Sequence, residues 1–381
     1  MQTMRLTELE TPALVLDQEK MDRNIARMRE HLARLGVAFR PHVKTPKAID
    51  VVRRMISTPA GPITVSTLKE AEYFFSYGIT DILYAVGITP NKLQHVARLM
   101  QAGARLKIIL DNEEMARAVV ACGREAGARF EVLIEIDCDG HRSGVKPDAP
   151  ELISIGKLLQ EGGAVLAGVM THAGSSYNCT SVEGIRAMAE QERSLAVHCA
   201  ERLRAAGLPC PVVSIGSSPT ATYAKDLSGV TEVRAGVFVF FDLVMAGIDV
   251  CKQDDIALSV LTTVIGHQRD RGWIITDAGW MAMSRDRGTA AQKIDQGYGV
   301  VCDAHGKPID GLIMAQANQE HGVIAHRSGD PAQTPDLPVG TLLRILPNHA
   351  CATGAQHDRY HVLESGQAAE VAAVWPRFSG W

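Results

Sequence analysis

Reactive side chains recur at the ends of short apolar runs in this chain of 381 residues. Lys44 follows the first of these runs, Arg142 follows the fifth, and His172 and Tyr177 follow the sixth. Most strand ends carry polar turn residues, so one such residue means little. In a fold whose parallel strands all end at one face, however, these side chains would meet in a single active site.

Lys44, in the segment Arg-Pro-His-Val-Lys-Thr, is the strongest catalytic candidate. A lysine that faces into the mouth of a barrel is costly to desolvate unless it is paired, or has a lowered pKa and so becomes a nucleophile. Such an amine forms an imine with an aldehyde cofactor. A solvated lysine at a strand end is the alternative, and the residue types leave both readings open.

Two turns of small residues are candidates for phosphate binding. Gly216, Ser217 and Thr220 lie in a Gly-Ser-Ser-Pro-Thr turn after the seventh run, and Gly236 and Val237 follow the eighth. Backbone N–H groups and hydroxyls can cradle a phosphate, and the loops after the seventh and eighth strands of a barrel often do so. The sequence therefore predicts one phosphate site to which both turns contribute.

The remaining candidates at strand ends are a histidine, a tyrosine and an arginine. His172 and Tyr177 share a Gly/Ser-rich loop, and we interpret both as cofactor contacts, although a lone histidine is more often structural. Arg142 lies in Gly-His-Arg-Ser-Gly and could hold a carboxylate or the cofactor hydroxyl. A salt bridge within the loop is the alternative for Arg142.

An H-x-C pair, His349 and Cys351, follows the apolar run at 342–346. If the strand continues, residues two apart point to the same face, so an imidazole and a thiolate would face one spot. These are ligands of a borderline-soft metal such as zinc. Two ligands are too few for a closed structural site, so the pair predicts an open site that water or substrate completes. A buried cysteine beside a loop histidine is the alternative.

Apolar runs alternate with helical patterns up to about Met245, which is typical of βαβ units around a parallel sheet. Eight such runs are what a (β/α)8 TIM barrel requires, and an open doubly wound sheet is the alternative. We place this α/β domain at residues 13–246. The runs are Val37–Val43, Ile63–Thr67, Ile82–Val86, Leu106–Leu110, Val132–Ile136, Val165–Thr171, Val212–Ile215 and Val230–Ala235.

Helical periodicity between the runs predicts a helix over Lys20–Leu35, capped by Asp17, and a longer one over Val182–Ala206 that ends at Gly207. After Met245 the pattern becomes β-rich. We place a second domain at residues 247–381, joined by residues 1–12. Its predicted strands are Ile256–His267, Gly272–Asp277, Gly340–Leu346 and Arg359–Leu363.

Composition excludes several classes of partner. The net charge is -4 with both signs mixed along the chain, so we expect no nucleic-acid partner and no anionic membrane partner. No apolar stretch is long enough to span a membrane, and the N-terminus lacks the apolar segment of a signal peptide. Eight scattered cysteines without a C-x-x-C pair favour reduced thiols and a cytoplasmic location.

Taken together, several segments resemble the eukaryotic-type D-serine dehydratase and D-threonine aldolase family, in the same order and over essentially the whole chain. The segments that carry the resemblance are Thr11–Val15, Arg40–Thr45, Val65–Glu72, His172–Tyr177, Asp277–Gly288, Asn318–Gly322 and Pro347–Cys351.

The resemblance implies an alanine racemase-like fold, in which a barrel that binds pyridoxal 5'-phosphate (PLP) is followed by a β-rich domain. It implies that Lys44 holds the cofactor and that His349 and Cys351 hold a metal. It further implies a homodimer whose active sites are each completed by the β-domain of the other subunit. The chain departs from a close relative at Phe238, where that relative has tyrosine, and in the segment 356–360. These departures bear on substrate choice.

The implied reaction removes water from a D-3-hydroxy amino acid, such as D-threo-3-hydroxyaspartate or D-serine, and yields a 2-oxo acid and ammonia. Lys44 would remove the Cα proton, and a divalent metal would bind the β-hydroxyl. Zinc suits the thiolate best, with manganese, cobalt or magnesium as alternatives. Glu320 and His321 are candidates for substrate contact near the β-oxygen, and a structural role is equally open.

Three other activities are alternatives. Retro-aldol cleavage of D-threonine or 3-hydroxy-D-aspartate to glycine and an aldehyde would use the same groups, but H-x-C in place of H-x-D favours the dehydratase. Amino-acid racemisation needs no metal. Small non-catalytic PLP carriers of the same fold lack the second domain and its H-x-C pair.

Overall fold

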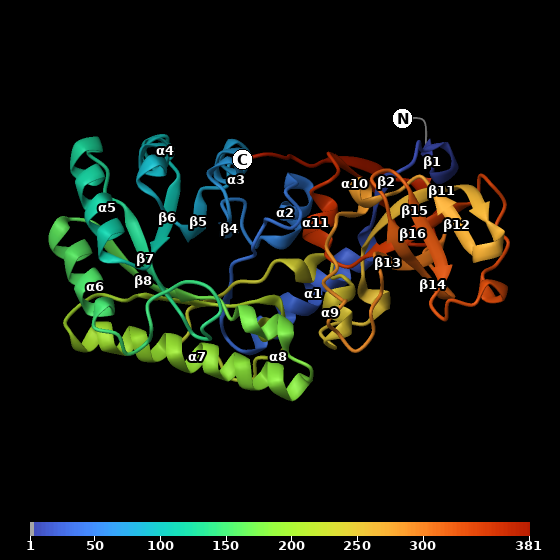
Figure 1. Cartoon of the computed structure of the whole chain (residues 1–381). Coiled ribbons are helices and arrows are strands. Elements are labelled where there is room, and N and C mark those ends of the chain that lie inside the picture. Colours follow the sequence, from blue (N-terminus) through green and yellow to red (C-terminus); the bar gives the residue numbers. More distant parts are fainter. Residues whose placement is uncertain (1–3) are drawn as a thin grey trace. The chain divides into compact units, whose positions relative to one another are not determined.

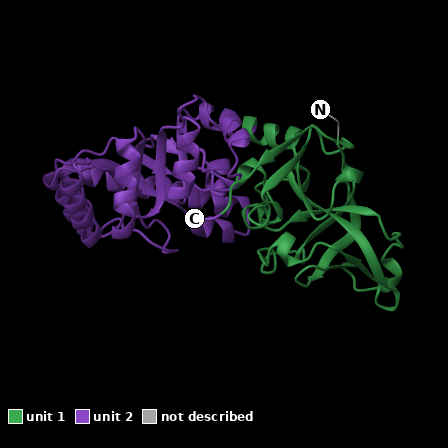
Figure 2. Ribbon diagram, turned by 90° about the horizontal axis from the view of Figure 1, so that it is seen from above, with its two compact units in different colours: residues 1–26, 237–379 green, residues 27–236, 380–381 purple. Residues whose placement is uncertain are grey.

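The computed structural model describes residues 4–381, which form two compact units (Figures 1 and 2). Residues 27–236 with 380–381 form what we call the barrel unit. Residues 4–26 with 237–379 form the β unit.

The sequence pattern places the domain limits at 13–246 and at 247–381 with 1–12, of which residues 1–3 lie outside the described residues. Packing divides the described chain after Ala26 and after Gly236 instead. One reason is that β2 (Ala13–Asp17) pairs with two strands of the β unit, so the chain enters the barrel unit only within its first long helix.

The barrel unit contains a parallel sheet with the strand order β3-β10-β9-β8-β7-β6-β5-β4. Each of the eight apolar runs of the sequence overlaps one of these strands, so the predicted α/β architecture is confirmed. The strands are β3 (Ala38–Phe39), β4 (Ile63–Val65), β5 (Asp81–Gly87), β6 (Arg105–Leu110), β7 (Glu131–Ile136), β8 (Val165–Thr171), β9 (Val212–Ile215) and β10 (Glu232–Val233). The helices are α1 (Gln18–Arg34), α2 (Ile49–Met55), α3 (Leu68–Ser76), α4 (Pro90–Gln101), α5 (Glu113–Ala126), α6 (Glu151–Gly162), α7 (Val182–Ala205) and α8 (Ser218–Tyr223).

The segment just before Lys44 closes this sheet into a barrel. β3 pairs with β10, and the chain then stays extended until His42 forms a parallel bridge with Thr64 of β4. The Thr64 N–H donates to the Pro41 carbonyl at 2.8 Å, and the Val43 N–H donates to the Thr64 carbonyl at 2.9 Å. An open doubly wound sheet would leave these two edges unpaired, so that alternative is wrong.

Paired charges lie inside the barrel among the apolar strands. The strands are buried along most of their length, as expected when helices cover a parallel sheet. Arg40 nevertheless lies inside, where it donates to Glu232 and to Asp81, each at 2.8 Å. Buried charges of this kind are tolerated only when they are paired and hydrogen-bonded. The Arg40 cluster therefore adds paired charges to a barrel unit whose strands otherwise pack through apolar residues such as Leu83 and Leu133.

Local signals for the helices agree with the structure. The predicted cap of α1 is confirmed, because the Lys20 N–H donates to Asp17 Oδ1 at 3.0 Å. The long helix α7 ends just before Gly207, which has a φ of 76° in the left-handed region that favours glycine.

The β unit is built on a nine-stranded sheet with the order β12-β15-β14-β13-β16-β11-β2-β17-β19, and β1 pairs with β18. The four strands predicted from the sequence are confirmed as β11, β12, β16 and β17, whereas β13, β14 and β15 were not predicted. Besides β2, the strands are β1 (Met4–Arg5), β11 (Leu258–Gln268), β12 (Trp273–Thr276), β13 (Gly299–Asp303), β14 (Pro308–Ala317), β15 (Gly322–His326), β16 (Leu342–Pro347), β17 (Arg359–Leu363), β18 (Glu370–Val371) and β19 (Ala373–Pro376). Short helices α9 (Leu243–Gly247), α10 (Trp280–Met283) and α11 (Ala350–Gly354) join them.

Candidate active site and metal loop

Lys44 lies in the turn between the bridge residue His42 and α2, and its side chain is exposed. Among the described residues it has neither an ion pair nor a hydrogen bond. Two neighbouring lysines differ, because Lys47 lies 3.3 Å from Glu70 and Lys69 lies 3.9 Å from Glu72. An unpaired amine at the end of a barrel strand is what attachment to an aldehyde requires.

Two imidazoles beside Lys44 are held neutral. Burial lowers the pKa of His42 well below its ordinary value, and the charges of Lys44 and Arg234 lower it further. Nε2 of His42 lies 3.4 Å from Ser66 Oγ, whereas its buried Nδ1 has no partner within residues 4–381. A buried polar atom without a partner fits a ligand group that the chain itself does not supply. His42 was not predicted as a site residue, although His42 lies in the same motif as Lys44.

His172 is fixed by the loop after the neighbouring strand. Its Nδ1–H donates to the Gly216 carbonyl at 2.9 Å, and its ring centroid lies 6.1 Å from that of Tyr177. Burial lowers the pKa of His172 to about 3, although the bond to Gly216 acts in the opposite direction. The imidazole is therefore neutral, with the Nε2 lone pair available. The structure brings His172 and Tyr177 together, as a cofactor contact requires.

Arg142 is exposed, and its Nη2 lies 3.7 Å from Glu135 Oε1. This salt bridge joins the loop to strand β7, so it differs from the alternative of a salt bridge within the loop. Burial raises the pKa of Glu135, and the charge of Arg142 opposes that shift. The role of Arg142 toward a cofactor stays a prediction.

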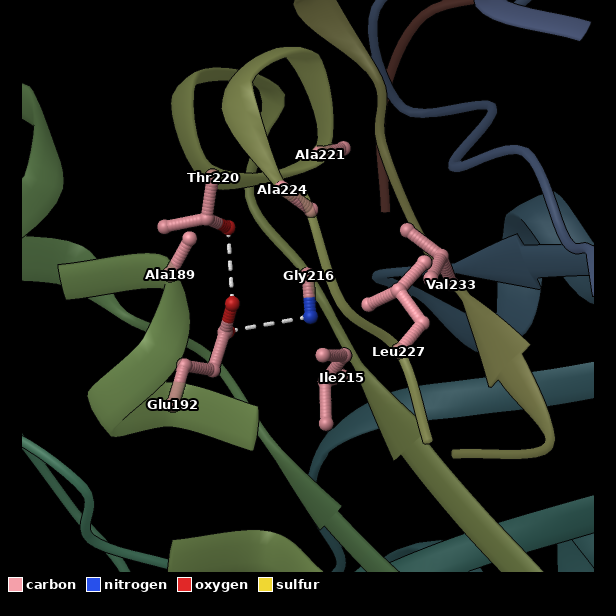
Figure 3. Close-up of a pocket in the computed structure, with 9 residues that line it drawn as sticks. All are labelled: Ala189, Glu192, Ile215, Gly216, Thr220, Ala221, Ala224, Leu227 and Val233. Atoms are coloured by element: carbon pink, nitrogen blue, oxygen red, sulfur yellow. Dashed lines mark hydrogen bonds between the residues drawn. The ribbon is translucent and has the colours of Figure 1, made fainter. Parts of the chain in front are cut away.

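The Gly216–Thr220 turn is tightly bonded to its surroundings. Gly216 has a φ of 133°, and a Cβ there would collide with the Arg234 carbonyl, so only glycine lets β9 and β10 approach this closely. Its N–H donates to Glu192 at 3.0 Å, while Ser217 Oγ lies 2.8 Å from Ser176 Oγ. Figure 3 shows Glu192 reaching from α7 toward this turn.

Gly236 follows β10, which pairs with β9, so the structure brings both predicted phosphate turns to adjacent strand ends. A Cβ on Gly236 would lie 3.1 Å from the His42 carbonyl, which explains a glycine at this position. Val237 begins a 3-10 turn (Val237–Val239) at the start of the next stretch of the β unit. Hydroxyls and glycines at two neighbouring ends are the features that a phosphate site uses.

One detail of the predicted metal loop is wrong. The strand β16 ends at Pro347, and His349 is the N-cap of α11, so the strand does not continue through Cys351. The pair nevertheless meets, because Cys351 lies in the first turn of α11 and hydrogen-bonds the His349 side chain. An N-cap residue brings its side chain back over the first turn of its helix.

Two aspartates that the sequence analysis missed hold this loop within the β unit. Asp286 Oδ2 lies 2.7 Å from His349 Nδ1, and Asp242 Oδ2 accepts the Ala350 N–H at 3.0 Å. Burial alone would lower the pKa of His349, but its bonds to Asp286 and Cys351 outweigh burial and raise it to about 11. Since Asp286 occupies Nδ1, the metal donors would be Nε2 and the Cys351 sulfur, each of which must release its proton when the metal binds.

The donor set fits a metal with an incomplete protein shell. No group of three or more histidine, cysteine or acidic side chains with metal-binding geometry occurs among the described residues. An imidazole and a thiolate suit zinc, and the rest of the shell would come from water or substrate. Glu320 and His321 are both exposed in the turn between β14 and β15, and their role stays a prediction.

The barrel with its lysine and the β unit with its histidine–cysteine pair define an enzyme of the alanine racemase fold. Residues 16–244 match the family model "Alanine racemase, N-terminal domain", and residues 257–363 match "Putative serine dehydratase domain". The chain belongs to the family that combines these two domains, and the resemblance to the D-serine dehydratase and D-threonine aldolase family is confirmed.

Its relatives include D-threo-3-hydroxyaspartate dehydratase of Delftia sp. (strain HT23), which is 56% identical over 381 residues and 99% of each chain. The D-serine dehydratase of Dictyostelium discoideum is 31% identical over 94% of this chain and 95% of its own. The solved structure of the Delftia enzyme superposes with a TM-score of 0.95 over 99% of this chain and 100% of its own, at 56% identity. A cysteine-to-alanine variant of D-threo-3-hydroxyaspartate dehydratase, solved in the metal-free form, has a TM-score of 0.95 at 55% identity, covering 99% and 100% of the two chains.

Two further observations concern residues 4–381. None of the helices in residues 4–381 is both long and apolar enough to cross a membrane. The eight cysteines, all of which lie within these described residues, form no disulfide.

Proposed function

We propose that this chain is a PLP-dependent dehydratase that converts a D-3-hydroxy amino acid to a 2-oxo acid and ammonia. The observation that carries the proposal is the 56% identity to D-threo-3-hydroxyaspartate dehydratase over 99% of both chains. D-threo-3-hydroxyaspartate is therefore the first substrate to test, and D-serine is the second. The absence of a disulfide among the eight cysteines of the described chain is consistent with a reducing cytoplasm as the place of action.

Lys44 would hold the cofactor covalently through its amine, and the Gly216–Thr220 turn would bind the phosphate. PLP, when bound, supplies a ring that takes up the charge left at Cα when its proton departs. The Lys44 amine would accept that proton. The neutral His172 packs beside Tyr177 and adds no competing positive charge at the mouth of the barrel.

His349 and Cys351 would hold a divalent metal, for which zinc fits the thiolate best and manganese, cobalt or magnesium are alternatives. The metal, when bound, supplies Lewis acidity to the β-hydroxyl, so that hydroxide becomes a tolerable leaving group. Asp286 keeps the imidazole in the orientation that presents Nε2. Glu320 and His321 are candidates to donate the proton that the leaving β-oxygen needs.

The decisive experiment measures products. Purified protein with PLP and zinc is given D-threo-3-hydroxyaspartate, D-serine or D-threonine, and ammonia, 2-oxo acid and glycine are quantified. We expect ammonia and 2-oxo acid in equal amounts. Glycine as the main product would replace this proposal with the aldolase reaction. Chelation should remove activity, and added divalent metal should restore it.

We also propose a homodimer in which the β unit of one subunit completes the site of the other, as the family resemblance implies. Lys44→Ala and His349→Ala are each expected to be inactive. Unfolding and refolding them as a mixture should restore about a quarter of wild-type activity, because half of the dimers would be hybrids with one intact site. Each variant refolded alone is the control. No recovery from the mixture, with dimers seen by light scattering, would contradict shared sites.

A further inference from the structure

Glu192 is a buried carboxylate that the proposed mechanism does not use. It lies on α7 and has no exposed surface. Its Oε1 accepts the N–H groups of Ala173 at 2.9 Å and Gly216 at 3.0 Å, and its Oε2 accepts the Thr220 hydroxyl at 2.7 Å. Figure 3 shows the bonds to Gly216 and Thr220. One side chain thus binds three donors that lie far from it in the sequence.

The buried surroundings of Glu192 disfavour the charged form of its carboxylate. Burial raises its pKa, and the three hydrogen bonds and the charge of Arg234 oppose that shift. Among the described residues no cation forms an ion pair with it. The pocket into which it points is otherwise largely apolar, and its other lining residues are Ala189, Ile215, Gly216, Thr220, Ala221, Ala224, Leu227 and Val233. An apolar side chain would fill this space but would leave these three buried donors without an acceptor, so the glutamate is there to hold the donors.

The three donors belong to two different loops at the carboxyl ends of the strands. Ala173 follows β8 and is adjacent to His172, whereas Gly216 and Thr220 follow β9. Gly216 is held on both sides, because its N–H donates to Glu192 and its carbonyl accepts from His172. Glu192 therefore sets the position of the Gly216–Thr220 turn relative to the loop that carries His172.

We propose that Glu192 is a positioning residue for the cofactor. Glu192 fixes the Gly216–Thr220 turn, so that the donors of the turn that it does not itself bind keep a fixed arrangement for a phosphate. This inference rests on the proposed function, in which that turn binds the phosphate of PLP. Glu192 does not touch the phosphate itself. It accepts the Gly216 N–H and the Thr220 hydroxyl proton, so the donors left to a phosphate would be other groups of the turn.

The test compares two ligands that differ only in the phosphate. Dissociation constants for PLP and for pyridoxal are measured by absorbance titration of the cofactor-free protein. Glu192→Leu fills the apolar pocket but accepts no hydrogen bond, so we expect PLP to bind at least about tenfold more weakly while pyridoxal binding is unchanged. Glu192→Gln retains an oxygen for Ala173 and Gly216 and should keep most of the preference for PLP.

Two further variants separate positioning from stability. Glu192→Asp keeps the charge but is one methylene too short to reach both loops, so its preference for PLP should also fall. Asp81→Asn disturbs a different carboxylate inside the barrel, the partner of Arg40, and should lower the unfolding temperature without changing the preference. Folded Glu192→Leu or Glu192→Asp protein with the wild-type preference would overturn the inference. A wild-type protein that binds pyridoxal as tightly as PLP would instead overturn the proposed phosphate site.

Discussion

The proposed phosphate turn of the barrel unit (residues 216–220) and the proposed metal loop of the β unit (residues 347–351) are both held by buried or half-buried carboxylates, but in different ways. Glu192 binds backbone N–H groups and a hydroxyl, and so sets the path of a whole turn. Asp286 binds one imidazole nitrogen, and so sets the direction of a single side chain. A phosphate needs several donors arranged around it, whereas a metal needs one lone pair aimed at it. Each carboxylate matches the ligand that its loop would receive.

The histidines of the two units show the same contrast in their charge. Burial lowers the pKa of His172 to about 3, and its partner is a carbonyl. The pKa of His349 rises to about 11 despite burial, because its partners are a carboxylate and a thiol. In the metal-free chain these two buried histidines therefore differ in charge because their partners differ, and a metal bound through Nε2 would displace the proton of His349. The predictions below test this contrast, beginning with the largest expected effect.

Lys44→Ala should abolish covalent attachment of the cofactor and lower activity by about 100- to 10,000-fold, the range over which a positioned proton-transfer group contributes. Borohydride reduction followed by peptide mapping measures the attachment. Lys47→Ala is the matched control, because Lys47 already pairs with Glu70 and should leave the adduct on Lys44. An adduct that maps to Lys47 or Lys69 would show that the cofactor lysine is misassigned.

Cys351→Ala should lower zinc affinity by more than about 100-fold, which exceeds the loss expected for an outer partner of a ligand. Competition with a chromophoric chelator measures the affinity. The binding of PLP should not change, because the barrel unit keeps all of its predicted cofactor contacts. A variant that still binds zinc like wild type would remove Cys351 from the metal site.

Asp286→Asn should have a smaller effect on the same measurement and lower zinc affinity by about 10- to 100-fold, because the amide holds His349 Nδ1 less firmly. Asp358→Asn is the control, since that exposed aspartate pairs with Arg359 instead. Equal zinc affinities in the two variants would mean that Asp286 does not orient His349.

His172→Gln should change only the pH dependence of stability in the cofactor-free protein. Above pH 6.5 His172 is neutral in both the folded and the unfolded chain, so its contribution is fully present. As the pH falls from 6.5 toward about 3, the unfolded chain takes up a proton that folded His172 resists, and this stability is lost. Urea unfolding between about pH 7 and about pH 4 should show a shallower decline of the free energy of unfolding in the variant. An identical decline would indicate that His172 is not buried in the neutral form.

The sequence by itself determined the eight barrel strands, four strands of the β unit, the two longest helices and a set of candidate reactive groups. Runs of β-forming residues that are apolar at nearly every position can be recognised locally, because both faces of a barrel strand are buried. Lys44, His349 and Cys351 were found in the same way, since each lies in a short motif directly after such a run.

Only the tertiary structure decided which residues hold those groups. Glu192 lies within a long helix, where its sequence position resembles that of a solvated glutamate, and the loops that it binds lie 19 and 24 residues away. Asp286 is 63 residues from His349, and Asp242 is 108 residues from Ala350. The end of β16 at Pro347 was likewise invisible in the periodicity. A hydrogen bond to a buried carboxylate depends on where the chain returns in space, and no local pattern of residues records that.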